Sequence, residues 1–320
     1  TVNPTPMAPS DVGVDLPGGQ FGKPVAMSSA DIEDVISGFA FVARTAKETG
    51  FDGVQIHAAH GYLLSEFLSP IANRRTDAYG GDIGGRSRLL LEAVKAVRTE
   101  TGSDYPIAVK LNSADFQQGG FTHEECLQVV TMLNEAGVDL LEVTGGNYEQ
   151  PTMMGSEGLE PVFENDTRAS TRKREAYFLD YSRSVRAVAE MPVMATGGFR
   201  TRSTMIAALE DGDADMIGLA RPLCVDPDAP SKLLNSELEQ LRSWEQELKL
   251  GPTKWLSSDS PFGLIKAMNG FGAQAWFCLQ IERLARGESP EVNLGVFKAL
   301  MTYQSQESKR AKAYLAALNG

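Results

Sequence analysis

Two of the three histidines in the chain, His57 and His60, lie in the short stretch IHAAHGYLLSEFLSP (residues 56–70), and Tyr62 follows two residues later. Such a group can bind a metal, donate hydrogen bonds to a substrate oxygen, or satisfy an ordinary buried turn. A metal site needs a third and a fourth ligand, and His123 falls inside a helical capping box, which predicts an exposed side chain. The second role needs only two imidazole N–H groups that stabilise developing negative charge, and Tyr62 can then serve as a general acid.

Lys110 stands near the end of an otherwise apolar segment, PIAVKLN (residues 106–112). An ammonium group in apolar surroundings is costly unless it meets an anion. Three interpretations follow for this lysine: a side chain that extends to solvent, a Schiff-base nucleophile as in aldolases, or a counter-charge to an electron-rich ring.

Glycines and an arginine follow two further apolar segments, in TGGF (residues 196–199) and in LARP (residues 219–222). Gly197 and Gly198 allow a phosphate to approach the backbone, and Arg221 can pair with it through two hydrogen bonds. In a barrel, phosphate sites lie at the loops after the last two strands. The two motifs together predict a site for a phosphorylated ligand.

Short apolar segments alternate with helical patterns, which is typical of strand–helix units. The first and third of the expected helices begin with capping boxes, Ser28 with Asp31 and Thr122 with Glu125. The segments show little polar alternation, which predicts strands buried on both faces of a parallel sheet. The expected strands cover residues 51–57, 106–112, 140–146, 192–198 and 216–222, and the expected helices cover residues 28–50, 86–100, 122–137, 172–190 and 201–210.

Polar and glycine residues gather at the carboxyl ends of these strands, where a TIM (β/α)8 barrel keeps its active site. A barrel needs eight strands, at roughly 30 residues per unit, and about five are found. We expect residues 1–235 to form a partial barrel without the first three units, and residues 1–27 within it to form an extended loop. The sequence of residues 236–320 predicts a helical extension that packs on the barrel or on a partner. Open strand edges would need a complementing chain or a second copy of this chain.

The bulk composition narrows the class of protein. The 320 residues carry a formal net charge of −12, which disfavours nucleic-acid binding. Apolar runs stay well short of the ~20 residues that cross a membrane, and the N-terminus lacks the basic and apolar regions of a signal peptide.

Cys126, Cys224 and Cys278 form no CxxC pair, so an iron–sulfur cluster or structural zinc site lacks its ligands. Sparse thiols favour a reducing compartment, and we expect a cytoplasmic location.

One long motif resembles the signature of the Old Yellow Enzyme family of flavin-dependent ene-reductases. It runs FDGVQIHAAHGYLLSEFLSPIANRRTDAYGG and is followed by GRSRLLLEAV, GGFTHEECL, ATGGF and GLARPLCVDPDAP. The resemblance covers roughly residues 1–235. The stretch NPTPMAPSDV resembles the loop after the third strand of that family, which agrees with the strand count.

The resemblance implies a barrel that binds FMN and takes hydride from NAD(P)H. His57 falls at the position of the histidine that binds the substrate oxygen, and His60 at the second position of the pair, where members carry His or Asn. Tyr62 matches the tyrosine that protonates the substrate. Lys110 falls where the family places a basic residue against flavin N1 and O2. The phosphate-binding positions are matched by Gly197, Gly198 and Arg221, with Ala220 beside the arginine where glycine is common.

The activity that the resemblance implies is hydride transfer from NAD(P)H through FMN to the β-carbon of an α,β-unsaturated carbonyl, with Tyr62 protonating the α-carbon. A branch of the family with a cysteine cluster after the barrel is disfavoured, because only Cys278 lies in that region. Two other functions remain open: an aldolase-type barrel that uses Lys110, and a non-catalytic barrel fragment.

Overall fold

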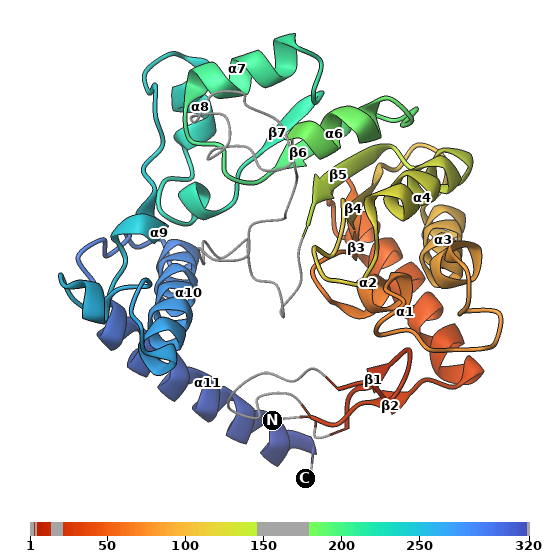
Figure 1. Cartoon of the computed structure of the whole chain (residues 1–320), viewed down its shortest axis with the longest axis horizontal. Helices are drawn as coiled ribbons and strands as arrows, with labels where there is room; N and C mark the ends of the chain where they lie inside the picture. The colour runs from red at the N-terminus through yellow and green to blue at the C-terminus, as the bar shows by residue number, and fades with distance from the viewer. Residues whose placement is uncertain (1–2, 4, 14–21, 146–178, 319–320) are drawn as a thin grey trace.

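A parallel sheet of five strands organises the molecule. The computed structural model describes residues 3, 5–13, 22–145 and 179–318. The strands pair in parallel and in chain order, so neighbours in sequence are neighbours in the sheet. Figure 1 shows the sheet curving with its helices on the outer side. The prediction of five strands of a (β/α) barrel is thereby confirmed, and in the described residues the barrel is not closed. The strands are β3 (Val54–Ala58), β4 (Ile107–Asn112), β5 (Leu140–Thr144), β6 (Val193–Thr196) and β7 (Met216–Gly218).

The helices that follow the strands cover the outer face of the sheet (Figure 1). Both predicted capping boxes are present, with Ser28 and Asp31 at α1 and with Thr122 and Glu125 at α4. The helices around the sheet are α1 (Ser29–Glu48), α2 (Leu63–Leu68), α3 (Ile83–Thr101), α4 (His123–Glu135), α6 (Leu179–Arg186), α7 (Arg202–Glu210) and α8 (Ala229–Leu234). The later elements are α9 (Trp244–Glu247), the 3-10 turn η3 (Lys254–Leu256), α10 (Gly263–Ala285) and α11 (Val296–Leu318).

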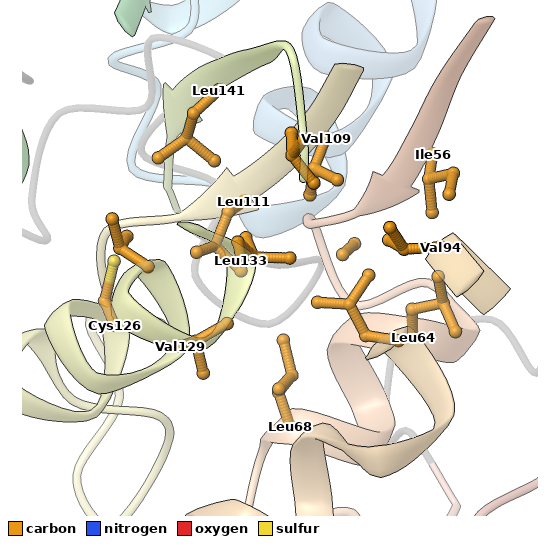
Figure 2. Close-up of a cluster of buried hydrophobic side chains, with 14 of the residues drawn as sticks. Ile56, Leu64, Leu68, Val94, Val109, Leu111, Cys126, Val129, Leu133 and Leu141 are labelled. Atoms are coloured by element: carbon orange, nitrogen blue, oxygen red, sulfur yellow. The ribbon is translucent and has the colours of Figure 1, made fainter. Parts of the chain in front are cut away.

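The main core lies between the outer face of the sheet and the helices. Figure 2 shows its side chains from the strands meeting those from the helices. Alternate residues of β3, β4 and β5 and Val193 of β6 enter this core, as the period of two in a strand requires, while Ala195 and Ile217 join a second cluster. The buried members labelled in Figure 2 are Ile56, Val109, Leu111 and Leu141 from the strands and Leu64, Leu68, Val94, Cys126, Val129 and Leu133 from the helices.

The inner face of the sheet differs from the expectation. We predicted strands that show little polar alternation and are buried on both faces, but the alternate residues of β3, β4 and β5 that face inward include polar and charged ones. His57, Lys110 and Glu142 stand opposite one another across these three strands. The apolar appearance of the segments therefore comes mainly from the outer face, although Ala108 and Leu140 lie on the inner face.

Several local details also depart from the sequence analysis. Residues 1–27 were expected to be a loop, yet β1 (Met7–Ala8) and β2 (Val25–Ala26) form a short parallel pair. The helix α2 was not predicted. The last strand ends at Gly218 rather than at residue 222, and a 3-10 turn, η2 (Arg221–Cys224), follows it. Residues 172–178 of one predicted helix lie outside the described residues, and α6 covers the later part.

The segment after residue 236 packs on the end of the sheet's last unit. Trp276 of α10 is fully buried, and Cys224, Val225 and Trp244 pack against its cluster. Helices α10 and α11 pack along each other. Within the described ranges, none of the helices is both long and apolar enough to cross a membrane.

Arg86 joins three elements beneath the loop that carries Tyr62. The side chain is 3% exposed and donates to the Leu68 carbonyl at the end of α2, to the Gly81 carbonyl, and to the carboxylate of Glu125 on α4. Removal of one partner from a buried ion pair leaves an uncompensated charge, which costs about 3–5 kcal/mol. Arg86 therefore fixes α2 against α3 and α4.

We expect Arg86→Met to lower the free energy of unfolding by about 3 kcal/mol, because Glu125 and two carbonyls lose their partner. Urea denaturation followed by far-UV circular dichroism measures this change. Arg88→Met is the matched control, since the Arg88 side chain is 50% exposed and lies 4.0 Å from Glu92; its cost should stay below about 1 kcal/mol. Equal losses in the two variants would contradict the assigned role of Arg86.

Glu66 on α2 gives the fold a pH dependence. Burial raises the pKa of its carboxyl from 4.5 to about 7. Between these two values the folded state keeps a proton that the unfolded state has lost, so stability falls as the pH rises through this window and then levels off.

We expect Glu66→Gln to remove this fall and to exceed the wild type in stability at pH 8 by on the order of 2–3 kcal/mol. Urea denaturation at pH 5 and at pH 8 measures the difference. Glu210→Gln, at an exposed position of α7, should leave the pH dependence unchanged. A Glu66→Gln variant that loses as much stability as the wild type between these pH values would refute the assignment.

Candidate active site

A row of three ionisable side chains crosses the inner face of the sheet. Cα pairing places His57 of β3 opposite Lys110 of β4, and Lys110 opposite Glu142 of β5. Because side chains at paired positions of neighbouring strands point to the same face, the three groups are adjacent. His57 and Lys110 were predicted site residues, and the register brings them together.

Three rings gather at the carboxyl end of β3. The ring centroids of His57 and His60 lie 5.3 Å apart in an edge-on arrangement, and those of His57 and Tyr62 lie 5.0 Å apart. Tyr62 occupies the N-cap position of α2 and is 47% exposed. The two imidazoles and the phenol thus form one cluster, as the spacing of the sequence predicted, and its tyrosine is open to solvent.

The backbone and side chain of His60 are both anchored. Its φ of 63° places it in the left-handed region. The His60 N–H donates to Asn112 Oδ1 at 3.2 Å, and His60 Nε2 lies 2.9 Å from Thr144 Oγ1. Burial, with the positive charge of Lys110 second, lowers the pKa of His60 to about 3. The ring is therefore neutral at physiological pH and carries a single N–H.

His57 is also biased toward the neutral form. Burial lowers its pKa, the Lys110 charge lowers it further, and the Glu142 charge opposes both. Its Nδ1 atom is buried without a hydrogen-bond partner among the residues that the structure describes. A buried polar atom of this kind is uncommon in proteins and indicates a place for a ligand or water molecule.

Lys110 forms an ion pair with Glu142. Lys110 Nζ lies 2.7 Å from Glu142 Oε1, and the two side chains are 21% and 7% exposed. Burial by itself raises the pKa of Glu142, but the hydrogen bond and charge of Lys110 outweigh it, and the net shift is downward. A Schiff-base lysine must present a neutral nitrogen to a carbonyl, whereas this nitrogen is held by a carboxylate, which argues against the aldolase-type function.

The predicted phosphate-binding residues lie after β6 and β7. Gly197 and Gly198 have φ values of 140° and 75°, which glycine adopts at little cost. Ala220 and Arg221 begin η2, so the arginine starts a short turn of helix instead of ending a strand. Both loops follow the carboxyl ends of their strands, on the same edge of the sheet as the histidines.

A second arginine and a carboxylate accompany Arg221. Arg200 directly follows the glycine loop, is 7% exposed, and pairs with Glu245 of α9, whose Oε1 also lies 3.8 Å from Arg221. Arg200 Nε and Glu245 Oε2 are buried with no hydrogen bond to the described residues. Neither residue was predicted from the sequence. Glu245 lies in a segment without a motif, whereas the position of Arg200 directly after GGF could have indicated it.

His123 was expected to be exposed, and this was wrong. It is partly buried at the start of α4, where Nδ1 lies 3.2 Å from the Ser113 carbonyl and Nε2 lies 2.6 Å from Ser184 Oγ. Ser113 and Ser184 hold it away from the other histidines. Within the described ranges, no three His, Cys, Asp or Glu residues are grouped so that they could hold a metal ion.

Comparisons with known proteins agree with this geometry. Residues 2–240 match the model of the NADH:flavin oxidoreductase / NADH oxidase family. A NADH-dependent flavin oxidoreductase of Talaromyces variabilis is 36% identical over 269 residues, which are 83% of this chain and 63% of that protein. A NADPH dehydrogenase of a Geobacillus species is 35% identical over 204 residues, which are 64% of this chain and 54% of that protein.

Solved structures also match this chain. The Old Yellow Enzyme homologue of Zymomonas mobilis matches 74% of this chain and 63% of its own with a TM-score of 0.57 and 27% identity. A 2-naphthoyl-CoA reductase in complex with 2-naphthoyl-CoA matches 85% of this chain and 39% of its own with a TM-score of 0.65 and 26% identity. The chain therefore spans less than two thirds of these relatives. The match of residues 2–240 to the family model, together with the five parallel strands, shows that the chain belongs to the NADH:flavin oxidoreductase / NADH oxidase family.

Proposed function

We propose that the protein is an FMN-dependent ene-reductase, which moves hydride from NAD(P)H to the β-carbon of an α,β-unsaturated carbonyl compound. The observation that carries the proposal is the cluster of His57, His60 and Tyr62 at the carboxyl end of β3, beside the Lys110–Glu142 pair. Two neutral imidazoles, a phenol and a held cation are the groups that such a reaction requires at one place.

The residues present fit FMN. Lys110 provides a cation at the inner face of the sheet, where the pyrimidine edge of an isoalloxazine ring would lie. Gly197 and Gly198 offer backbone N–H groups to a phosphate, and Arg221 begins the next turn with about a third of its side chain exposed. The buried Arg200 Nε, which has no hydrogen bond to the described residues, adds a donor in the same region.

The bound flavin would supply hydride transfer, and the chain would orient and polarise the substrate. His57 and His60 would donate hydrogen bonds to the carbonyl oxygen and stabilise the negative charge that develops on it. The pKa of each histidine is shifted downward, which favours the neutral rings, so the oxygen would be polarised without being protonated. Tyr62 would deliver a proton to the α-carbon from the solvent-exposed side of the cluster.

We also propose that further barrel strands complete the sheet, from another segment or from another chain. β3 and β7 form its two edges in the described residues. Large apolar side chains are exposed on the helix that precedes β3 and on β7 itself: Phe41 and Val42 on α1 and Met216 on β7 are exposed by about half or more. Open edges with apolar neighbours are sites of strand pairing. We propose residues 1–235 as the barrel part and residues 236–320 as a helical extension.

Flavin binding tests the proposed function. We expect the purified protein to bind FMN, with a yellow absorbance that dithionite bleaches, and light scattering on the same sample shows whether one chain suffices. Arg221→Met should weaken FMN binding about 10- to 100-fold, since a charge-assisted hydrogen bond is lost, while the affinity for riboflavin, which has no phosphate, stays the same. A colourless protein that FMN does not reconstitute would refute the proposal and favour a non-catalytic fragment.

Tyr62→Phe tests the proton donor. We expect reoxidation of the reduced flavin by cyclohexenone to slow by a factor of about 10²–10⁴, the range for loss of a general acid. Stopped-flow absorbance measures this step and, separately, flavin reduction by NADH or NADPH. Tyr79→Phe is the matched control, because Tyr79 hydrogen-bonds Glu92 away from the site. Equal slowing of both half-reactions in Tyr62→Phe would contradict the role of Tyr62 as the acid.

A further inference from the structure

Glu142 is an acidic residue in an unusual place. It lies in the middle of β5 between Leu141 and Val143, which enter the core, and it is only 5% exposed. A buried carboxylate is costly unless it is paired. Its position on the inner face puts this negative charge in the site, where a flavin oxidoreductase must bind an electron-rich ring.

The charged partner of this carboxylate is Lys110. The register places Glu142 directly opposite Lys110 on the neighbouring strand, and the ion pair closes at 2.7 Å. A hydrogen bond from Gln55 of β3 also stabilises the charged form and contributes to the lowered pKa of Glu142. The Lys110 ammonium, on a flexible stem of four carbons, is thus held by a carboxylate on a rigid strand.

The charge of Glu142 also shifts the pKa of both histidines. Lys110 lowers the pKa of both His57 and His60, and Glu142 raises the pKa of both. The two charges therefore act as a pair on both histidines at the carboxyl end of β3. Removal of the carboxylate would leave an uncompensated buried cation beside them.

We propose that Glu142 is a positioning residue that fixes the Lys110 ammonium and reduces the net positive charge that Lys110 presents to the flavin and to the histidine pair. The proposal rests on the proposed function for its flavin part. The cation alone would favour the anionic reduced flavin, and the paired carboxylate weakens that preference. Glu142 thereby sets how readily the bound cofactor accepts electrons.

Glu142→Gln tests the proposal, because it removes the charge and keeps the size and the hydrogen-bonding oxygen. With FMN bound, we expect the equilibrium constant for two-electron reduction to rise about tenfold, which equals an upward shift of about 30 mV in the midpoint potential. A dye-coupled spectroscopic titration measures it. In the flavin-free protein, the pKa of His57, followed by NMR of its ring nitrogens, should fall. Glu135→Gln, at the exposed end of α4, removes the same formal charge and should change neither quantity.

A double-mutant cycle shows whether the effect passes through Lys110. In a Lys110→Met background we expect the Glu142→Gln shift in potential to shrink, because the buried Glu142 carboxylate without its cation takes up a proton and leaves little charge to remove. An equal shift in both backgrounds would mean that Glu142 acts on the flavin directly and would overturn the proposal. If Glu142→Gln does not fold, Glu142→Asp withdraws the carboxylate by one methylene and should give a smaller shift of the same sign.

The two readouts keep this inference separate from the proposed function. A protein that binds no FMN refutes the ene-reductase assignment, yet the pKa of His57 still reports on the pairing of Glu142 with Lys110. A folded Glu142→Gln variant in which the His57 pKa is unchanged overturns the positioning role, whether or not flavin is bound.

Discussion

Parallel pairing in register is the constraint on which the site depends. Every second side chain of β3, β4 and β5 must enter the core beneath the helices, where Ile56, Val109 and Leu141 are buried. The intervening residues are then forced to the inner face, so His57, Lys110 and Glu142 share one row. A slip of one residue in any of these strands would bury a charge in the core and expose an apolar side chain in the site. The stability of the core and the geometry of the site are thus enforced by the same pairing.

His60 and helix α2 are anchored by hydrogen bonds, and the proposed proton donor, Tyr62, is exposed at the start of that helix. Arg86 ties α2 to α3 and α4, and Asn112 and Thr144 hold His60 from the ends of β4 and β5. Tyr62 begins α2 and reaches solvent. An anchored His60 beside an exposed Tyr62 fits the proposed reaction, in which the substrate would enter over the phenol and the proton would be replaced from water.

Much of this arrangement could be predicted from the sequence, and the successes share a cause. Strands and capped helices are local patterns, so the five strands and the Ser28 and Thr122 caps were recognised. The family motif is also a local pattern, and it placed His57, His60 and Arg221 among the predicted site residues. The ion pair of Lys110 with Glu142 could not be foreseen, because it joins residues 32 positions apart through a register that becomes known only in three dimensions. Glu245 lies farther still from Arg200 and sits in a four-residue helix that carries no motif. His123 was misjudged for the same reason, since its partner Ser184 belongs to another helix.

The left-handed backbone of His60 limits which amino acids evolution can place there. Asn, Asp and His enter this region far more often than other residues that carry a side chain, and β-branched residues are nearly excluded. Among these three, an aspartate would repel an electron-rich oxygen, which leaves histidine and asparagine as donors that also fit the turn. The alternation of His and Asn that the family resemblance implies at this position then has a conformational origin as well as a chemical one. Few amino acids can therefore replace His60 in a search for altered substrate preference. Wider variation must be sought at Asn112, which holds the His60 backbone, and at Thr144, which holds the ring, because both lie at ordinary strand positions.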